Sequence, residues 1–238
     1  MIRNMLRTTE GENMEKTGNG LKTVGTKKKL IILAAVMAAV VGITFLTRLL
    51  FLIEIMWVLR LLQCVLYAMM AVPAIIGMKM SGMDVRKQLD FKNKKQYLWG
   101  FVVFAVLSLV VAVIPALFGN SLIGSHTEPN PFDVAMSAVF YIVFVGPVEE
   151  LVFRGYVQET LVEILPKNKW LGAVIAAALF GFWHIINGSF VQVLFTFAIG
   201  LFIGLMKYFV KNCTLISVSL GHGVYDFMNI IWRILIVK

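Results

Sequence analysis

Long apolar runs separated by short polar segments dominate the pattern of this 238-residue chain. Each run is close to the roughly 20 residues that an α-helix needs to cross a bilayer. The pattern predicts seven spans, at residues 30–51, 55–78, 97–118, 132–151, 170–187, 190–208 and 215–237, with the fourth helix running on to Leu165. We therefore expect an all-α fold, a polytopic membrane helix bundle with about seven transmembrane helices.

Composition supports the same class of protein. Hydrophobic residues make up 59% of the chain and charged residues 15%, against roughly 45–50% and about 25% in an ordinary soluble domain. These values exclude a secreted disulfide scaffold, a soluble nucleic-acid binder and a disordered tail protein. We expect a multi-pass protein of the cell membrane, surrounded by lipids and with no nucleic-acid partner.

The positions of the cations predict how the chain is oriented. The net charge is +9, and 17 of the 22 Lys and Arg residues lie in the segments 1–29, 79–95, 167–169 and 207–211, all on one side of the predicted bundle. The segments 119–131 and 187–189, on the other side, contain no Lys or Arg. The positive-inside rule therefore places the N-terminus in the cytoplasm.

Six ionisable residues stand out against the apolar background of the second half of the chain. An ionisable side chain at bilayer depth costs roughly 2.5–3.5 kcal/mol on insertion scales, so each is a candidate functional residue. They are Glu149, Glu150, Arg154, His184, His222 and Asp226. At about 1.5 Å per residue, Glu149, His184, His222 and Asp226 lie about 9–16 Å inside the predicted membrane boundaries, which allows the three helices to bring their polar groups together near mid-membrane.

The first group is the pair of adjacent glutamates followed by an arginine. Glu150 and Arg154 are four residues apart, so on a helix they can form an ion pair on one face. The side chain of Glu149 points about 100° away from that of Glu150, so Glu149 stays available for catalysis. The alternative is that both glutamates mark the cytoplasmic end of a span.

Two further groups place an imidazole four residues from a second side chain. Phe180 and His184 share one helical face, as do His222 and Asp226, and glycines flank His222 on both sides. These glycines let another backbone or a substrate approach closely. The alternatives are a hydrogen-bonded packing histidine at 184 and a buried His-Asp pair that locks two helices together.

In this order the three groups resemble the CAAX-protease and bacteriocin-processing family, also called CPBP or Abi, which includes the type II CAAX prenyl proteases. The resemblance covers residues 132–237. It rests on the patterns E-E-x-x-x-R, F-x-x-x-H and H-x-x-x-(N or D), found here at Glu149, Glu150 and Arg154, at Phe180 and His184, and at His222 and Asp226.

The resemblance implies an intramembrane endopeptidase of the glutamate type. Glu149 and His184 would then activate the water that attacks the scissile carbonyl, while His222 and Asp226 stabilise the oxyanion. Glu150 belongs to the same catalytic set, with Arg154 and Phe180 in support. Asp226 stands where the prenyl proteases have Asn, and an ionised carboxylate cannot donate to an oxyanion. It must therefore be protonated or orient His222, and a prenylated substrate is a weaker inference.

The expected partner is a peptide or protein substrate, membrane-associated or lipidated, and the expected reaction uses no cofactor. Zinc is the weaker alternative, because the chain lacks H-E-x-x-H and its histidines lie on separate helices. A non-catalytic immunity or partner-binding membrane protein, or a transporter, is the alternative from another class. Along the chain we expect a basic cytoplasmic tail at 1–29, accessory transmembrane helices and loops at 30–131, and the catalytic core at 132–238.

Overall fold

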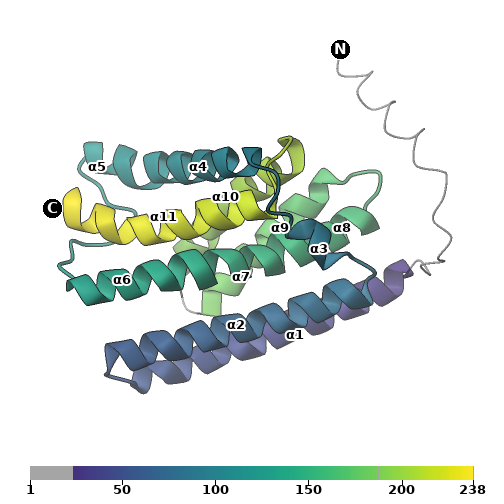
Figure 1. Ribbon diagram of the computed structural model, residues 1–238, viewed down its shortest axis with the longest axis horizontal. Coiled ribbons are helices and arrows are strands. Elements are labelled where there is room, and N and C mark those ends of the chain that lie inside the picture. The colour runs from purple at the N-terminus through teal and green to yellow at the C-terminus, as the bar shows by residue number, and fades with distance from the viewer. Residues whose placement is uncertain (1–23, 187, 238) are drawn as a thin grey trace, which may run out of the picture.

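Helices supply the regular structure of residues 24–186 and 188–237, the part of the chain that the computed structural model describes (Figure 1). No β-strand occurs among these residues, and the predicted all-α helix bundle is confirmed. Most of the predicted basic tail lies outside the described residues. The described helix α1 begins at Thr26, so Lys27 and Lys28 are helical and not part of a tail.

The elements follow one another with short connections. In chain order they are α1 (Thr26–Leu49), η2 (Leu50–Leu52), α2 (Met56–Met80), α3 (Val85–Gln88), α4 (Lys95–Ser108), η3 (Leu109–Val113), α5 (Ile114–Leu117), α6 (Pro131–Val139), η4 (Phe140–Val145), α7 (Gly146–Glu150), η5 (Leu151–Val157), α8 (Gln158–Ile164), α9 (Trp170–Trp183), η6 (His184–Ile186), α10 (Phe190–Phe209) and α11 (Leu215–Leu235). The elements from α4 to α5 form one continuous helix, and those from α6 to α8 form another.

The observed helices begin and end within four residues of the predicted spans. In the described residues, five helices are long and apolar enough to cross a membrane, so the chain is a multi-pass membrane protein. They are Thr26–Thr47, Trp57–Met80, Lys95–Leu117, Pro131–Ile164 and Phe190–Phe209. The other two predicted spans are helical as well, but α9 is short and α11 carries His222, Asp226 and Arg233.

Two of the long helices widen into π-helical turns that end two residues before a proline. The turn η4 precedes Pro147, and η3 precedes Pro115. Proline lacks the N–H that would bond to the carbonyl four residues earlier, and its ring crowds that carbonyl. A wider turn relieves the crowding, and such turns occur frequently at functional sites. Here the turn η4 leads directly into the segment that carries Glu149.

Helix α11 lies between α4 on one side and the α6–α8 helix on the other (Figure 1). Glycines on α11 let the backbones of both neighbouring helices approach closely. A Cβ at Gly221 would lie 2.7 Å from the backbone oxygen of Gly100, and one at Gly223 would lie 2.6 Å from the backbone oxygen of Tyr141. The prediction that the glycines beside His222 let another backbone approach is confirmed. This close packing brings His222 of α11 next to Glu150 of α7.

Replacing Gly223 with alanine is expected to destabilise the bundle by about 1–3 kcal/mol, the usual range for overpacking, because the backbone atoms in contact cannot move aside. The thermal unfolding midpoint in detergent measures the effect. Gly42→Ala in α1 is the control, since no atom lies within 4 Å of its added Cβ. An equal fall in both midpoints would show that the α11 contact is not special.

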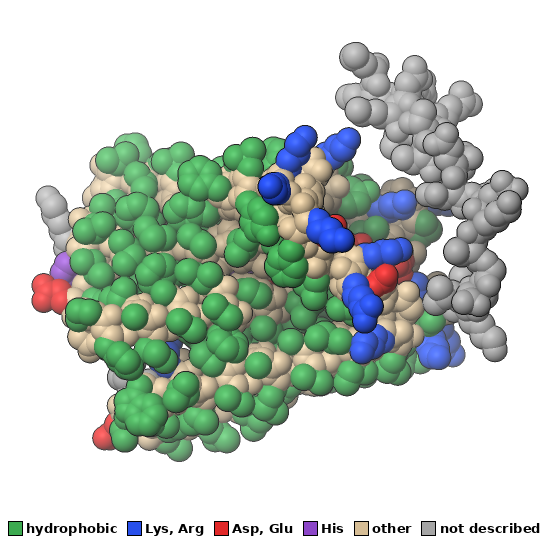
Figure 2. Space-filling view, viewed as in Figure 1, with side chains coloured by type: hydrophobic (Ala, Val, Ile, Leu, Met, Phe, Trp, Pro, Cys, Tyr) green, Lys and Arg blue, Asp and Glu red, His purple; other side chains and the backbone are tan. Residues whose placement is uncertain are grey.

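The surface is largely apolar along the bundle, while Lys and Arg gather toward one end (Figure 2). The exposed cations at that end include Lys27 and Lys28 at the start of α1, Lys167 and Lys169 before α9, and the segment 86–95. Two ion pairs join the same end, between Lys29 and Glu163 and between Lys207 and Glu159. The bundle therefore has one strongly basic end, which we call the basic end.

Candidate active site

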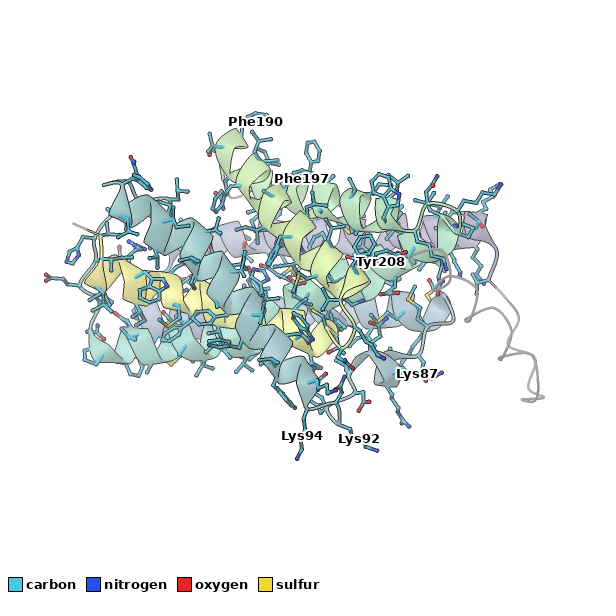
Figure 3. The ribbon with its side chains drawn as sticks, turned by 90° about the horizontal axis from the view of Figure 1, so that it is seen from above. Lys87, Lys92, Lys94, Phe190, Phe197 and Tyr208 are labelled. Carbon is cyan, nitrogen blue, oxygen red and sulfur yellow. The ribbon has the colours of Figure 1, made fainter. Side chains whose placement is uncertain are left out.

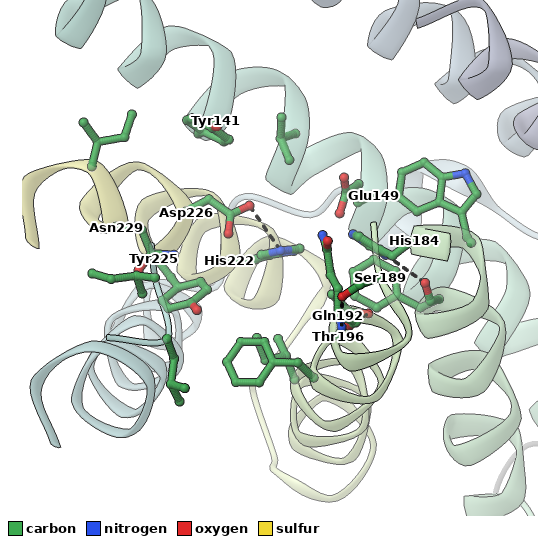
Figure 4. A pocket seen from close by; sticks show the side chains of 18 of the residues that line it. Tyr141, Glu149, His184, Ser189, Gln192, Thr196, His222, Tyr225, Asp226 and Asn229 are labelled. Carbon is green, nitrogen blue, oxygen red and sulfur yellow. Dashed lines mark hydrogen bonds and ion pairs between the residues drawn. The ribbon is translucent and has the colours of Figure 1, made fainter. Parts of the chain in front are cut away.

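The three predicted groups meet at one cavity of about 640 Å³ between α2, α7, α9, α10 and α11 (Figure 4). This volume falls within the roughly 300–1,000 Å³ that is usual for ligand sites. Five of the predicted residues line the cavity, whereas Glu150 and Arg154 lie behind its wall. The five are Glu149, Phe180, His184, His222 and Asp226.

Glu150 is the centre of a fully buried charge network. Arg154 Nη1 donates to Glu150 Oε1 over 2.9 Å, so the ion pair predicted from the spacing is present. His222 Nδ1 lies 2.7 Å from the same oxygen, which links α11 to α7. Glu150 and Arg154 have no exposed surface, and hydrogen bonds between charged groups in such a setting are short and strong. This glutamate is held in place by its neighbours.

Arg154 also stacks on the ring of Phe180, with its guanidinium carbon 4.4 Å from the ring centroid. This distance is well within cation–π range. Gly200 of α10 lies against both groups, and a Cβ at that position would come within 2.8 Å of each. The supporting residues Arg154 and Phe180 therefore form a closed layer behind the cavity. Helix α10 can pack against this layer only because position 200 is a glycine.

Glu149 is only 4% exposed, yet it lines the cavity. Its Oε1 accepts a hydrogen bond from the hydroxyl of Tyr67 on α2, over 3.2 Å. Sequence reasoning missed Tyr67, because a tyrosine in an apolar span resembles any packing aromatic. The only signal was its hydroxyl, which needs a partner when buried. Among the described residues, no hydrogen bond joins Glu149 directly to His184.

The reason lies in the local backbone at His184. Helix α9 ends at Trp183, and the chain tightens into η6, where His184 Nδ1 lies 2.9 Å from the carbonyl oxygen of Phe180. A carbonyl only accepts, so Nδ1 carries the proton in the neutral ring and Nε2 keeps a lone pair. Trp183 packs edge-on against the imidazole and is anchored by a 2.8 Å hydrogen bond to Thr44 of α1.

His222 is held between two carboxylates. Its Nδ1 contacts Glu150, and its Nε2 lies 3.4 Å from Asp226 Oδ2, so the shared face predicted for His222 and Asp226 is confirmed. Both nitrogens face acceptors, which suits a ring that donates from each. The Asp226 contact is long for a hydrogen bond, and its side chain is 21% exposed. The Nε2 side of His222 is thus the side open to the cavity.

Uncharged polar side chains complete the lining, and sequence reasoning missed them too. They come from the N-cap and first turns of α10, from η4 and from the second half of α11, where no recognisable spacing marks them. Their hydroxyl and amide groups can bind a peptide backbone. They are Tyr141, Ser189, Gln192, Thr196, Tyr225 and Asn229.

The site offers few ligands for a metal. Within the described residues, no three His, Cys, Asp or Glu side chains are arranged so that they could hold a metal ion. Glu150 and Asp226 approach opposite nitrogens of His222, and the ring lies between them. That the reaction needs no metal ion stays a prediction.

Comparison with known proteins bears on the same segment. A family model described as type II CAAX prenyl endopeptidase Rce1-like matches residues 131–228, which include all three motif groups. The resemblance to the CAAX-protease family is therefore confirmed for this part of the chain. No curated protein and no solved structure gives a significant match. The family supports a CAAX-type intramembrane protease, a hydrolase that acts on a peptide or protein.

Proposed function

We propose that the chain is an intramembrane endopeptidase in which Glu149 and His184 activate water and His222 stabilises the oxyanion. One observation carries the proposal. Glu149, His184 and His222 all line one cavity, although they come from three separate segments of the chain. A purely structural ion-pair cluster does not need a cavity beside it.

The reaction begins with water held between Glu149 and His184. Glu149 takes a proton as the water oxygen attacks the scissile carbonyl carbon, and His184 Nε2 accepts the second hydrogen bond of that water. The proton passes from Glu149 to the leaving nitrogen as the carbon–nitrogen bond breaks. The products are a carboxylic acid and an amine, and transfer of the acid's remaining proton to the amine gives a carboxylate and an ammonium group.

The developing oxyanion accepts a hydrogen bond from His222 Nε2. The contact between His222 Nε2 and Asp226 is long, so the same N–H remains available to a substrate oxygen in the cavity. Of the two roles open to Asp226, the geometry favours orienting His222 over donating to the oxyanion. A donor at this position is typically worth roughly 2.7–4 kcal/mol of transition-state stabilisation.

The substrate is a membrane-associated peptide or protein, and we propose that the basic end of the bundle faces the cytoplasm. The gathering of exposed Lys and Arg there supports this orientation (Figure 2). The N-terminus then lies in the cytoplasm and the C-terminus on the other side. Nothing in the lining requires a lipidated substrate.

A comparison of cell membranes tests the function and needs no identified substrate. Peptides are profiled in membranes that contain the wild-type protein or Glu149→Gln at equal expression. We expect at least one membrane peptide to accumulate uncut with the variant and to be cleaved when purified wild-type protein is added. Identical peptide profiles would overturn the proposal.

Strong chelators are expected to leave the cleavage rate unchanged, because the proposed water is activated by side chains alone. The measurement is the cleavage rate of protein purified without added zinc, before and after incubation with a chelator and dialysis. A loss of activity that zinc restores would instead establish the metal-dependent alternative.

Tyr67→Phe is expected to lower kcat roughly tenfold or more while KM changes little. A hydrogen bond to a charged group is worth about 1.5–3 kcal/mol, and the hydroxyl of Tyr67 positions Glu149 through such a bond. In a Glu149→Gln background, the same change should cause no further loss. Tyr97→Phe is the control, because its hydroxyl contacts Phe91 outside the cavity. A rise in KM with unchanged kcat would contradict the positioning role.

A further inference from the structure

The cavity occupies only one half of the bundle's length. In α10 its lining ends at Ile199, ten residues before the end of the helix, and in α11 it begins at His222. In the α6–α8 helix it reaches from Tyr141 to Glu149 and no further. The second half of α10, the start of α11 and the whole of α8 take no part in the lining.

A dense layer closes the cavity toward the basic end. Just beyond Glu149, the side chains of Phe153, Arg154, Tyr156 and Val157 are at most 1% exposed. Arg154 stacks on Phe180 within this layer, and Gly200 brings α10 tightly against both. A peptide arriving from the basic end would have to separate these contacts.

The opposite end of the cavity is formed by exposed segments. Leu122 and Ile123, in the loop without Lys or Arg, line it together with Arg233 near the end of α11. Leu122 is 58% exposed, and Arg233 Nε donates to the backbone oxygen of Ser125 over 2.7 Å, which holds the loop beside the mouth. Figure 3 shows that Phe190 at the start of α10 lies across the width of the bundle from Lys87, Lys92 and Lys94.

We infer that the cavity opens away from the basic end, to the non-cytoplasmic side of the membrane. The substrate class is then a membrane-anchored peptide whose scissile bond is presented from that side. Between the mouth and Glu149, the wall carries amide and hydroxyl groups at Gln192 and Thr196 beside the apolar Phe195. This lining fits an uncharged, extended segment. The inference rests on the proposed function and the proposed orientation.

Thiol labelling of the full-length chain in sealed membrane vesicles tests the direction of opening. The native thiols of Cys64 and Cys213 are buried. Burial raises the pKa of the Cys213 thiol to about 11, so a reagent selective for thiolates should react little with Cys213. Both native cysteines are nevertheless replaced by alanine, so that each variant carries a single thiol. Single cysteines are then introduced by Thr196→Cys in the cavity, Leu194→Cys on the same helix, and Lys92→Cys at the basic end.

Leu194 is the matched control, because it is 54% exposed and lies two residues from Thr196, but does not line the cavity. A membrane-impermeant reagent should modify Thr196→Cys in right-side-out vesicles and Lys92→Cys in inside-out vesicles. Leu194→Cys, facing lipid, should react in neither. Reaction of Thr196→Cys only in inside-out vesicles, or in neither preparation, would overturn the inference.

The two proposals can fail separately. Labelling needs no catalysis, so it reports the direction of opening even if no peptide is cleaved, and Glu149→Gln should leave it unchanged. If cleavage depends on Glu149 but Thr196→Cys reacts from the side of Lys92, only the inference about access falls. If labelling follows the expected pattern and no peptide accumulates with Glu149→Gln, the proposed function falls.

Discussion

Replacing Glu149 with glutamine lowers peptide cleavage by about 100- to 10,000-fold, the contribution that a general base typically makes. The amide keeps the size of the carboxyl group and can still accept the hydrogen bond from Tyr67. It cannot take a proton from water. We therefore expect kcat to collapse while the thermal unfolding midpoint and KM stay close to those of the wild type.

Glu163→Gln is the matched control for this substitution. Glu163 lies on the same long helix, at the basic end, where it pairs with Lys29 and is 43% exposed. Its replacement should leave kcat unchanged. Normal cleavage by Glu149→Gln would rule out Glu149 as the base, and an equal loss in both variants would indicate a general effect on folding.

Replacing Arg154 with methionine destabilises the protein by about 3–5 kcal/mol, the usual cost of removing one partner from a buried ion pair. Glu150 would remain fully buried, and among the described residues it would keep only His222 as a charged partner. The methionine also loses the stacking on Phe180. A large fall in the thermal unfolding midpoint in detergent, with lower expression, is the expected observation.

A double variant separates the buried charge from the packing. Glu150→Gln combined with Arg154→Met removes both charges, so it should be more stable than Arg154→Met alone. Lys29→Met breaks the ion pair with the exposed Glu163 and should cost less than about 1 kcal/mol. Equal destabilisation by Lys29→Met and Arg154→Met would show that burial of the pair at Glu150 contributes nothing.

These two predictions assign different tasks to adjacent glutamates. Glu149 lines the cavity and binds a neutral hydroxyl, whereas Glu150 points behind the wall into the charge network. Helical geometry makes this separation possible, since successive side chains point about 100° apart. An adjacent pair can thus supply one group for chemistry and one for structure.

The sequence by itself determined the features that depend on local order. Apolar runs of bilayer length predicted the helices to within four residues, because the hydrocarbon core admits only segments that satisfy their own backbone hydrogen bonds. The spacing of Glu150 and Arg154 predicted their ion pair, since i and i+4 always share a helical face. Ionisable residues stood out for the same reason that they are costly in lipid.

Only the tertiary structure decided how the helices present these groups to one another. The contact of Tyr67 with Glu149 and that of His222 with Glu150 join residues 82 and 72 positions apart. The contact of His222 with Glu150 depends on how closely α11 packs at Gly221 and Gly223. The turn at the end of α9 directs His184 Nδ1 to its own backbone and leaves Nε2 for the cavity. The spacing of residues along the sequence does not predict such distances, because they arise from packing between helices that are not neighbours in the chain.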